Sequence, residues 1–90
     1  MARWTLEFST DAEKDLAQLD RSLRRRIIDK LDWFLEHFEE IFPLPLTGEF
    51  KDFYKLRIGD RRIKYRIDWQ RYLISVEYIE HRSRAYKKRR

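Results

Sequence analysis

Residues 53–67, FYKLRIGDRRIKYRI, decide the fold of this 90-residue chain. Apolar and polar side chains alternate on both sides of Gly59-Asp60, and a period of two is typical of strands with one buried face. A glycine in the first position favours a two-residue hairpin turn. The sequence therefore predicts two antiparallel strands, 53–58 and 61–67, that meet at Gly59-Asp60.

The turn also determines which residues face each other across this hairpin. With Ile58 opposite Arg61, the apolar side chains all fall on one face of the sheet, which supports the register. The expected apolar pairs are Leu56 with Ile63 and Tyr54 with Tyr65.

A third strand is expected over residues 72–79. Residues 68–71 close the second hairpin, and we expect Ile67 to face Tyr72. This register places Tyr65 beside Ile74, Ile63 beside Val76, and Glu77 opposite Arg62. The apolar positions coincide again, so the pattern favours this pairing as well.

The opposite face of the first hairpin is basic. The expected register pairs Lys55 with Lys64 and Arg57 with Arg62, and Arg66 lies beyond them. Like charges directly opposite each other destabilise a sheet by roughly 0.2–1 kcal/mol per pair, and such conflicts are characteristic of functional sites. A bound phosphate chain would relieve the repulsion. The alternative is that these flexible side chains extend into water and lose little.

The first half of the chain predicts a strand followed by two helices. Residues 4–8 alternate like a half-buried strand. Thr10, with Glu13 three places later, is typical of a capping box that opens a helix, and Asp20 is placed to cap a second helix. Apolar residues recur at helical spacing after each cap: Ala12, Leu16 and Leu19, then Leu23, Ile27, Leu31, Phe34 and Phe38. We therefore expect a helical hairpin.

Pro43 and Pro45 end the helical region, since proline disfavours helix in the residue before it, and residues 43–52 are expected to be a connector. The predicted fold class is α+β: an N-terminal strand, a helical hairpin, then an antiparallel sheet of three further strands. No repeat or linker divides the sequence, so we expect one domain over residues 1–90, with 87–90 as a basic tail.

Composition narrows the classes of function. The chain has no Cys, which excludes disulfides, thiolate zinc sites and cysteine nucleophiles. Residues 1–45 carry 7 basic and 10 acidic side chains, whereas residues 46–90 carry 14 and 6, so the second half suits a polyanion or simply keeps the protein soluble. No apolar run approaches the ~20 residues of a membrane span, and no signal-peptide pattern opens the chain. We therefore expect the protein to be located in the cytoplasm.

Two segments resemble the RelE/ParE toxin superfamily, the toxin half of type II toxin–antitoxin pairs. Residues 54–65, YKLRIGDRRIKY, are similar to its Y-R-L-R-x-G-D-Y-R-V-x-Y segment, and His81-Arg82 with Tyr86 is similar to its closing G-H-R-x-x-V-Y. The likeness spans essentially the whole chain, because the order of elements also matches. Membership leaves two activities open: RelE-like members cut messenger RNA in the ribosomal A site, and ParE-like members poison DNA gyrase.

The resemblance implies a catalytic set of basic and aromatic residues. Carried over position by position, its members are Lys55, Arg57, Arg62, Arg82 and Tyr86. Further candidates for RNA binding are Lys64, Arg66 and His81. The sequence departs from the family pattern at Arg57, where a lysine is usual, at Arg61, where an aromatic residue is usual, and at Glu80, where glycine is frequent. The change at Arg57 removes one possible base, because arginine stays protonated.

RNA cleavage of this kind would use the ribose 2′-OH to attack the adjacent phosphate, with no metal and no small-molecule cofactor. In this hypothesis Lys55 is the base, because nearby cations oppose its protonation. Arg57 and Arg62 would hold the phosphate. Arg82 would support the leaving oxygen, and Tyr86 would stack on a base or orient the 2′-OH.

The resemblance also implies partners: a RelB-like antitoxin, typically acidic, and mRNA in the ribosomal A site. Two other hypotheses compete with the nuclease. One is a ParE-like gyrase inhibitor, and the other is a non-catalytic RNA-binding module whose affinity falls steeply with salt.

Overall fold

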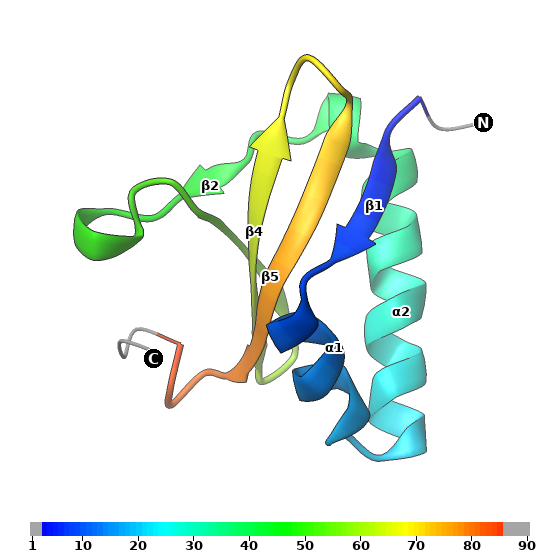
Figure 1. The fold of residues 1–90 in the computed structure, drawn as a ribbon. Helices are drawn as coiled ribbons and strands as arrows, with labels where there is room; N and C mark the ends of the chain where they lie inside the picture. Colours follow the sequence, from blue (N-terminus) through cyan, green and yellow to red (C-terminus); the bar gives the residue numbers. More distant parts are fainter. Residues whose placement is uncertain (1–2, 86–90) are drawn as a thin grey trace.

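The computed structural model describes residues 3–85, without the side chain of Glu49, and shows one five-stranded sheet with two helices against one face (Figure 1). The strands are β1 (Thr5–Phe8), β2 (Leu44–Pro45), β3 (Tyr54–Ile58), β4 (Arg61–Asp68) and β5 (Leu73–His81). Their order across the sheet is β1-β5-β4-β3-β2. The predicted α+β class is confirmed. The sheet is mixed, however, because β1 pairs with β5 in parallel while the other pairs are antiparallel.

The two helices are α1 (Thr10–Ala17) and α2 (Arg21–Glu36). Asp20 caps α2 as expected, since its carboxylate accepts a hydrogen bond from the Leu23 amide. The cap of α1 is Ser9 and not Thr10: the Ser9 hydroxyl accepts from the Ala12 amide and itself donates to the Glu77 carbonyl. A cap residue needs extended backbone, which Ser9 has, and the bond to β5 makes Ser9 the better choice.

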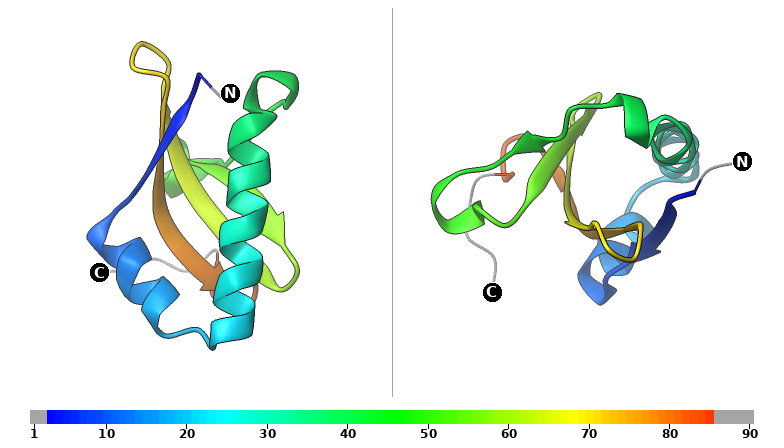
Figure 2. Two further views of the ribbon diagram at one scale, coloured as in Figure 1. Left: turned by 90° about the vertical axis from the view of Figure 1, so that its right-hand side faces the viewer. Right: turned by 90° about the horizontal axis from the view of Figure 1, so that it is seen from above.

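The helices lie against one face of the sheet (Figure 2), and the core fills the space between them. Two groups of buried side chains fill it. One joins both helices to the sheet through Ala12, Ile27, Leu31, Ile58, Ile63, Val76 and Ile79. The other is aromatic and surrounds Phe34 with Trp4, Phe38, Tyr65 and Ile74. Burial of this apolar surface supplies most of the favourable free energy of folding.

The first hairpin has the predicted register. The paired residues are Ile58–Arg61, Arg57–Arg62, Leu56–Ile63, Lys55–Lys64 and Tyr54–Tyr65. Gly59 occupies the left-handed region, with φ at +58°, where a side chain would be strained. The turn therefore requires glycine, which explains why the sequence pattern predicted it correctly.

The predicted register of the second hairpin is wrong. The turn takes four residues, 69–72, and Tyr72 has a positive φ of 52° that ends the ladder. The observed pairs are Ile67–Ile74, Tyr65–Val76, Lys64–Tyr78, Ile63–Ile79 and Arg62–Glu80. Glu77 is left over as a β-bulge between Val76 and Tyr78. The extra residue lets both halves of β5 keep their apolar side chains on the helix face.

The connector between α2 and β3 contains more structure than expected. It holds two short 3-10 helices, η1 (Phe38–Glu40) and η2 (Gly48–Phe50), on either side of β2. Strand β2 is an edge strand, a position that tolerates Pro45. Figures 1 and 2 show that η2 lies on the side of the sheet away from α2. Within residues 3–85, no helix is long and apolar enough to cross a membrane.

Replacing Tyr65 with Phe should leave the free energy of unfolding near neutral pH unchanged or raise it. The Tyr65 hydroxyl is buried and has no hydrogen-bond partner within the described residues, so its removal leaves nothing unsatisfied. Burial, and next the nearby Tyr54, raise the pKa of Tyr65 above its ordinary value of 10.0. The folded state thus holds this proton more tightly than the unfolded chain. The contribution of this protonated hydroxyl to the free energy of unfolding is complete below the ordinary pKa of 10.0. It is lost as pH rises through the higher pKa of the folded state.

Urea unfolding near neutral pH and near pH 11 measures both effects. Between the two conditions, Tyr65→Phe should lose less stability than the parent. Tyr72→Phe serves as the control, because it removes the hydroxyl of a tyrosine that is exposed. If Tyr65→Phe were strongly destabilised near neutral pH, the hydroxyl would have a partner and the argument would be wrong.

Candidate functional site

The face of the sheet away from the helices, called here the open face, carries the basic residues. Two rows of side chains cross it. One row is Lys55, Lys64 and Tyr78, and the next is Arg57, Arg62 and Glu80. The two expected like-charge pairs are therefore present. Their third members come from β5, and Glu80 takes the place that the predicted register assigned to Glu77.

The Lys64 ammonium lies inside the protein and is neutralised there. Its Nζ is 3.0 Å from a carboxylate oxygen of Glu80, and the two side chains are 1% and 6% exposed. The Phe50 ring of η2 lies against the same ammonium, with its centroid 4.1 Å from Nζ. In this position Lys64 does not face solvent as an RNA contact would. It instead cancels its charge against Glu80, which lowers the repulsion on Lys55.

Arg62 lies at the turn of the first hairpin and is 8% exposed. Its Nη1 donates to the carbonyl oxygens of Gly59 and Arg61, at 3.0 and 3.1 Å. A guanidinium has five N–H donors, so Nη2 and Nε keep donors for another acceptor. These two hydrogen bonds fix the position of the charge beside the turn.

Arg82 is brought to the same turn by its backbone. Its amide donates to the Asp60 carbonyl at 2.8 Å, so the chain after β5 begins beside Gly59-Asp60. The side chains of Arg57 and Arg82 are exposed. Arg26 of α2 also reaches this end of the molecule: a Cβ at Gly59 would lie 3.1 Å from its Nη2. Tyr86, the fifth predicted catalytic residue, lies outside the described residues.

His81 is engaged with its own chain. Its Nδ1 is 3.2 Å from the Ser83 amide nitrogen, which donates to it, and 2.9 Å from the Ser83 hydroxyl. Since an amide donates to Nδ1, the neutral ring carries its proton on Nε2. The two-residue period of β5 places His81 on the other side of the sheet from Glu80, away from the rows of the open face.

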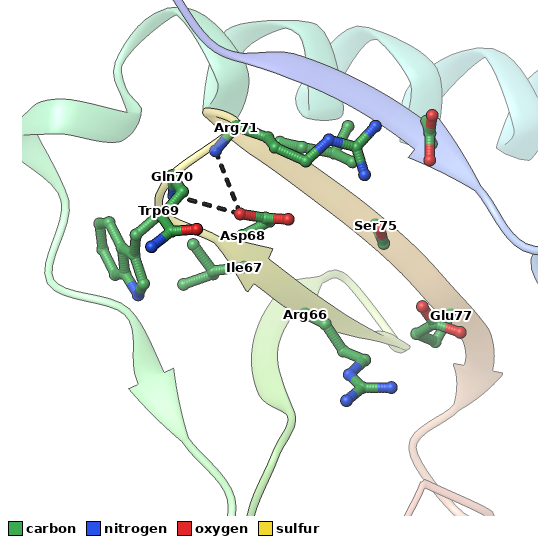
Figure 3. Close-up of a pocket in the computed structure, with 10 residues that line it drawn as sticks. Arg66, Ile67, Asp68, Trp69, Gln70, Arg71, Ser75 and Glu77 are labelled. Atoms are coloured by element: carbon green, nitrogen blue, oxygen red, sulfur yellow. Dashed lines mark hydrogen bonds between the residues drawn. The ribbon is translucent and has the colours of Figure 1, made fainter.

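Arg66 is exposed at the far end of the open face, where a pocket of about 620 Å³ opens (Figure 3). Glu7, Ser75 and Glu77 line the pocket together with the turn after β4. The Asp68 carboxylate accepts the amides of Gln70 and Arg71, both at 3.1 Å, and so organises that turn. The charges of the pocket are mixed, whereas those near Gly59-Asp60 are mainly cationic.

Within residues 3–85, no group of three or more His, Asp or Glu side chains is arranged to hold a metal ion. Near the turn, the arginines outnumber the carboxylates of Asp60 and Glu80, which suits a phosphate or another anion.

Residues 6–86 match the family model of the ParE toxin of type II toxin–antitoxin systems, parDE. The chain belongs to this family. The predicted membership of the RelE/ParE superfamily is therefore confirmed, and this ParE-family protein is a toxin of a type II toxin–antitoxin system. A search of curated proteins finds no significant match.

Solved structures of RelE toxins share the fold. The toxin–antitoxin complex RelBE2 from Mycobacterium tuberculosis contains a chain that is 23% identical, with a TM-score of 0.77, over 87% of this chain and 96% of that one. The isolated E. coli RelE toxin is 24% identical, with a TM-score of 0.70, over 87% of this chain and 83% of that one. A chain of the archaeal RelE–RelB complex from Pyrococcus horikoshii OT3 is 24% identical, with a TM-score of 0.66, over 91% of this chain and 98% of that one. At this level of identity the likeness shows the fold alone.

Breaking the Lys64–Glu80 pair from one side should destabilise the toxin. Glu80→Gln leaves the ammonium buried beside Phe50 without its counter-charge, and Lys64→Met removes the ammonium that lies 3.0 Å from the Glu80 carboxylate. We expect each to lower the free energy of unfolding by about 3–5 kcal/mol. The double variant Lys64→Met/Glu80→Gln should recover much of that loss, because neither buried charge then remains. Urea unfolding of the four proteins gives the coupling free energy.

The matched control is the exposed pair Arg25–Asp29, whose side chains are 80% and 65% exposed. Asp29→Asn should change stability little, since surface pairs contribute little. If the losses of the two single variants simply added in the double variant, Lys64 and Glu80 would not act as a pair.

Proposed function

We propose that this toxin is a ribosome-dependent mRNA endonuclease. The observation that carries the proposal is the gathering of cations from separate segments at one end of the open face. Arg57 and Arg62 face each other across β3 and β4, and the Arg82 amide is bonded to the turn between them. Cations that converge from neighbouring strands can stabilise the charge that builds on a phosphate during cleavage.

The proposed reaction is attack of a ribose 2′-OH on the adjacent phosphate, with departure of the 5′ oxygen of the next nucleotide. Lys55 is the proposed base, since Arg57 and Arg62 cannot lose a proton at ordinary pH. Lys55 lies half-buried one row from Arg57 and Arg62. Arg57, with its exposed guanidinium, and Arg62, through its remaining donors, would hold the phosphate oxygens.

In this proposal, residues after β5 act on the leaving oxygen and on a nucleobase of the substrate. Arg82 is assigned to the leaving oxygen, and Tyr86 to stacking on a base or orienting the 2′-OH. Arg66 is proposed as an outer RNA contact, whereas His81 lies on the other side of the sheet and is assigned no contact. Lys64, by contrast, supports this proposal as a positioning residue whose buried pair with Glu80 holds the two rows in place.

A purified translation system with ribosomes and a defined mRNA tests the proposal. The wild-type toxin should cut the message only when ribosomes are present. Lys55→Ala and Arg62→Ala should each lower the cleavage rate by about 100-fold or more, the usual contribution of a catalytic acid, base or charge-stabilising group. The measurement is primer extension on the message, with urea unfolding to verify that each variant is folded.

Arg25→Ala is the matched control, because it removes an exposed cation from α2 on the other side of the sheet. Its cleavage rate should equal that of the wild type. Unchanged cleavage by both Lys55→Ala and Arg62→Ala would remove the assignment of the site.

The second candidate function is inhibition of DNA gyrase, which the ParE name of the matched family favours. A gyrase inhibitor would block supercoiling without cutting RNA and would not depend on Lys55. A supercoiling assay with the same variants separates the two activities. RNA binding without turnover would instead identify a non-catalytic module.

We also propose an acidic, RelB-like antitoxin as the partner of this toxin. Solved relatives are complexes with RelB-type chains, and exposed apolar side chains such as Phe42 and Leu44 offer contacts for a partner. The open face offers the charge complement. Because the proposed substrate is mRNA on ribosomes, the toxin would act in the cytoplasm, as one domain.

Co-expression with the product of the adjacent gene tests the antitoxin. We expect a stable complex in which cleavage is suppressed and the toxin gains thermal stability, since a ligand that binds only the folded state raises it. If the two products failed to co-purify, the proposal that this antitoxin binds the toxin would be wrong.

A further inference from the structure

Two arginines lie on the helix side of the turn between β3 and β4. Arg61 and Arg62 are consecutive in β4, so their side chains leave the sheet on opposite faces. Arg61 therefore projects on the same side as Ile63, which packs in the core under the helices. Arg26 reaches this side from α2, since a Cβ at Gly59 would lie 3.1 Å from its Nη2. The end of the first hairpin thus carries cations on both faces.

The Arg61 guanidinium has no counter-charge. Its side chain is half-buried, and its Nε is buried without a hydrogen-bond partner within residues 3–85. No carboxylate in this part of the chain forms an ion pair with Arg61 or Arg26. The neighbour of Arg61 on β5 is His81, which is engaged with Ser83 and supplies no negative charge.

An unpaired, partly buried charge destabilises a protein that binds nothing there, and such groups are rare in native structures. Arg61 also stands where the superfamily pattern usually has an aromatic residue, which would leave no unpaired charge at this place. An anion against the Nη groups would neutralise the same delocalised guanidinium, because arginine binds phosphate through paired N–H donors. The position of Arg61 therefore favours an anionic ligand.

The anion that fits this place is a phosphate of an RNA strand. Arg57 and Arg62 lie on the opposite face of the same two-residue turn, where the proposed substrate is bound, and every nucleotide of that substrate brings a phosphate. A single strand is flexible enough to pass around the end of a hairpin, whereas a duplex is stiff. One strand can therefore place a phosphate on each side of the turn.

We infer that Arg26 and Arg61 form a second phosphate subsite, which binds a neighbouring nucleotide of the single-stranded RNA held on the open face. The inference rests on the proposed function and assigns a path to the substrate strand. The path runs from the open face, around Gly59-Asp60, to the first half of α2.

Fluorescence anisotropy with a labelled single-stranded RNA oligonucleotide, without ribosomes, tests the subsite. Arg61→Met and Arg26→Met should each weaken binding at low salt by about tenfold, because a charge-assisted hydrogen bond is lost. Each should also lower the slope of log affinity against log salt by about 0.7, the value for one phosphate contact on a single strand. Unchanged binding by Arg61→Met would overturn the inference.

Arg25→Met is the matched control. It removes a cation from the same helix with the same change in net charge, but Arg25 is exposed and paired with Asp29. Its effects should be much smaller, and losses equal to those of the other two variants would overturn the inference, because net charge alone would then explain them. Urea unfolding should find Arg61→Met at least as stable as the wild type, since a buried unpaired donor is removed.

A second measurement observes the wild-type toxin directly. The Nε–H of Arg61 is shielded from water, so its proton should exchange slowly enough to give an NMR signal, which is assigned by its absence from Arg61→Met. That signal should shift when the oligonucleotide is added, and the Nε–H signal of Arg25 should not. If the Arg61 signal did not move at saturating RNA, the subsite would be wrong.

The outcomes separate this inference from the proposed function. Ribosome-dependent cleavage that needs Lys55, with RNA binding indifferent to Arg26 and Arg61, would overturn the subsite alone. RNA binding that depends on both arginines without any cleavage would uphold the subsite and overturn the nuclease. If the variants lost binding to the antitoxin and kept binding to RNA, these arginines would belong to the antitoxin interface and the subsite would be wrong.

Discussion

Side chains of a strand alternate between the two faces of its sheet, so β3 and β4 cannot bury Leu56, Ile63 and Tyr65 under α2 without placing their cations on the other face. The apolar half of the hairpin drives folding, because its burial removes a large hydrophobic area from water. The same register places the basic side chains together on the opposite face, and no further interaction is needed to bring them there. Gly59 fixes that register through its left-handed turn, and a shift by one residue would exchange the two faces.

The concentration of charge that results has to be made compatible with a stable sheet. Lys64 is neutralised by Glu80 in a nearly water-free position, and Arg62 is held by two backbone carbonyls. The bulge at Glu77 makes the first of these possible, because it brings Tyr78 and Glu80 to the open face opposite Lys64 and Arg62. Repulsion is thereby confined to the side chains that reach solvent, among them Arg57.

The sequence predicted those features that depend on local patterns. The hairpin register followed from Gly59-Asp60, and the cap at Asp20 followed from its place before the helical repeat. The bulge could not be predicted, because β5 shows apolar residues that fit either register, and the length of the turn before it depends on the backbone of Tyr72. The cap of α1 depended on a tertiary bond from Ser9 to Glu77, which no local pattern reports.

The candidate site was predictable to a similar degree. Its strand residues, Lys55, Arg57 and Arg62, could be placed on one face because alternation alone decides that. The burial of Lys64 could not be predicted, because it depends on Phe50. Phe50 lies in the segment that the sequence predicted only as a connector. Arg26 approaches the same turn from α2, and only the packing of that helix on the sheet brings it there.

The burial of Lys64 also changes how the basic face is to be understood. A face on which every cation reached solvent would attract any polyanion without distinction. Here one of its cations is instead covered by Phe50 and paired with Glu80, and rings occupy the space beside it. Arg57 and Arg62 lie near Gly59-Asp60, whereas Arg66 is exposed at the far end of this face. The basic character of this face is therefore less uniform than its sequence indicates, because burial and pairing decide which of its cations an anion can reach.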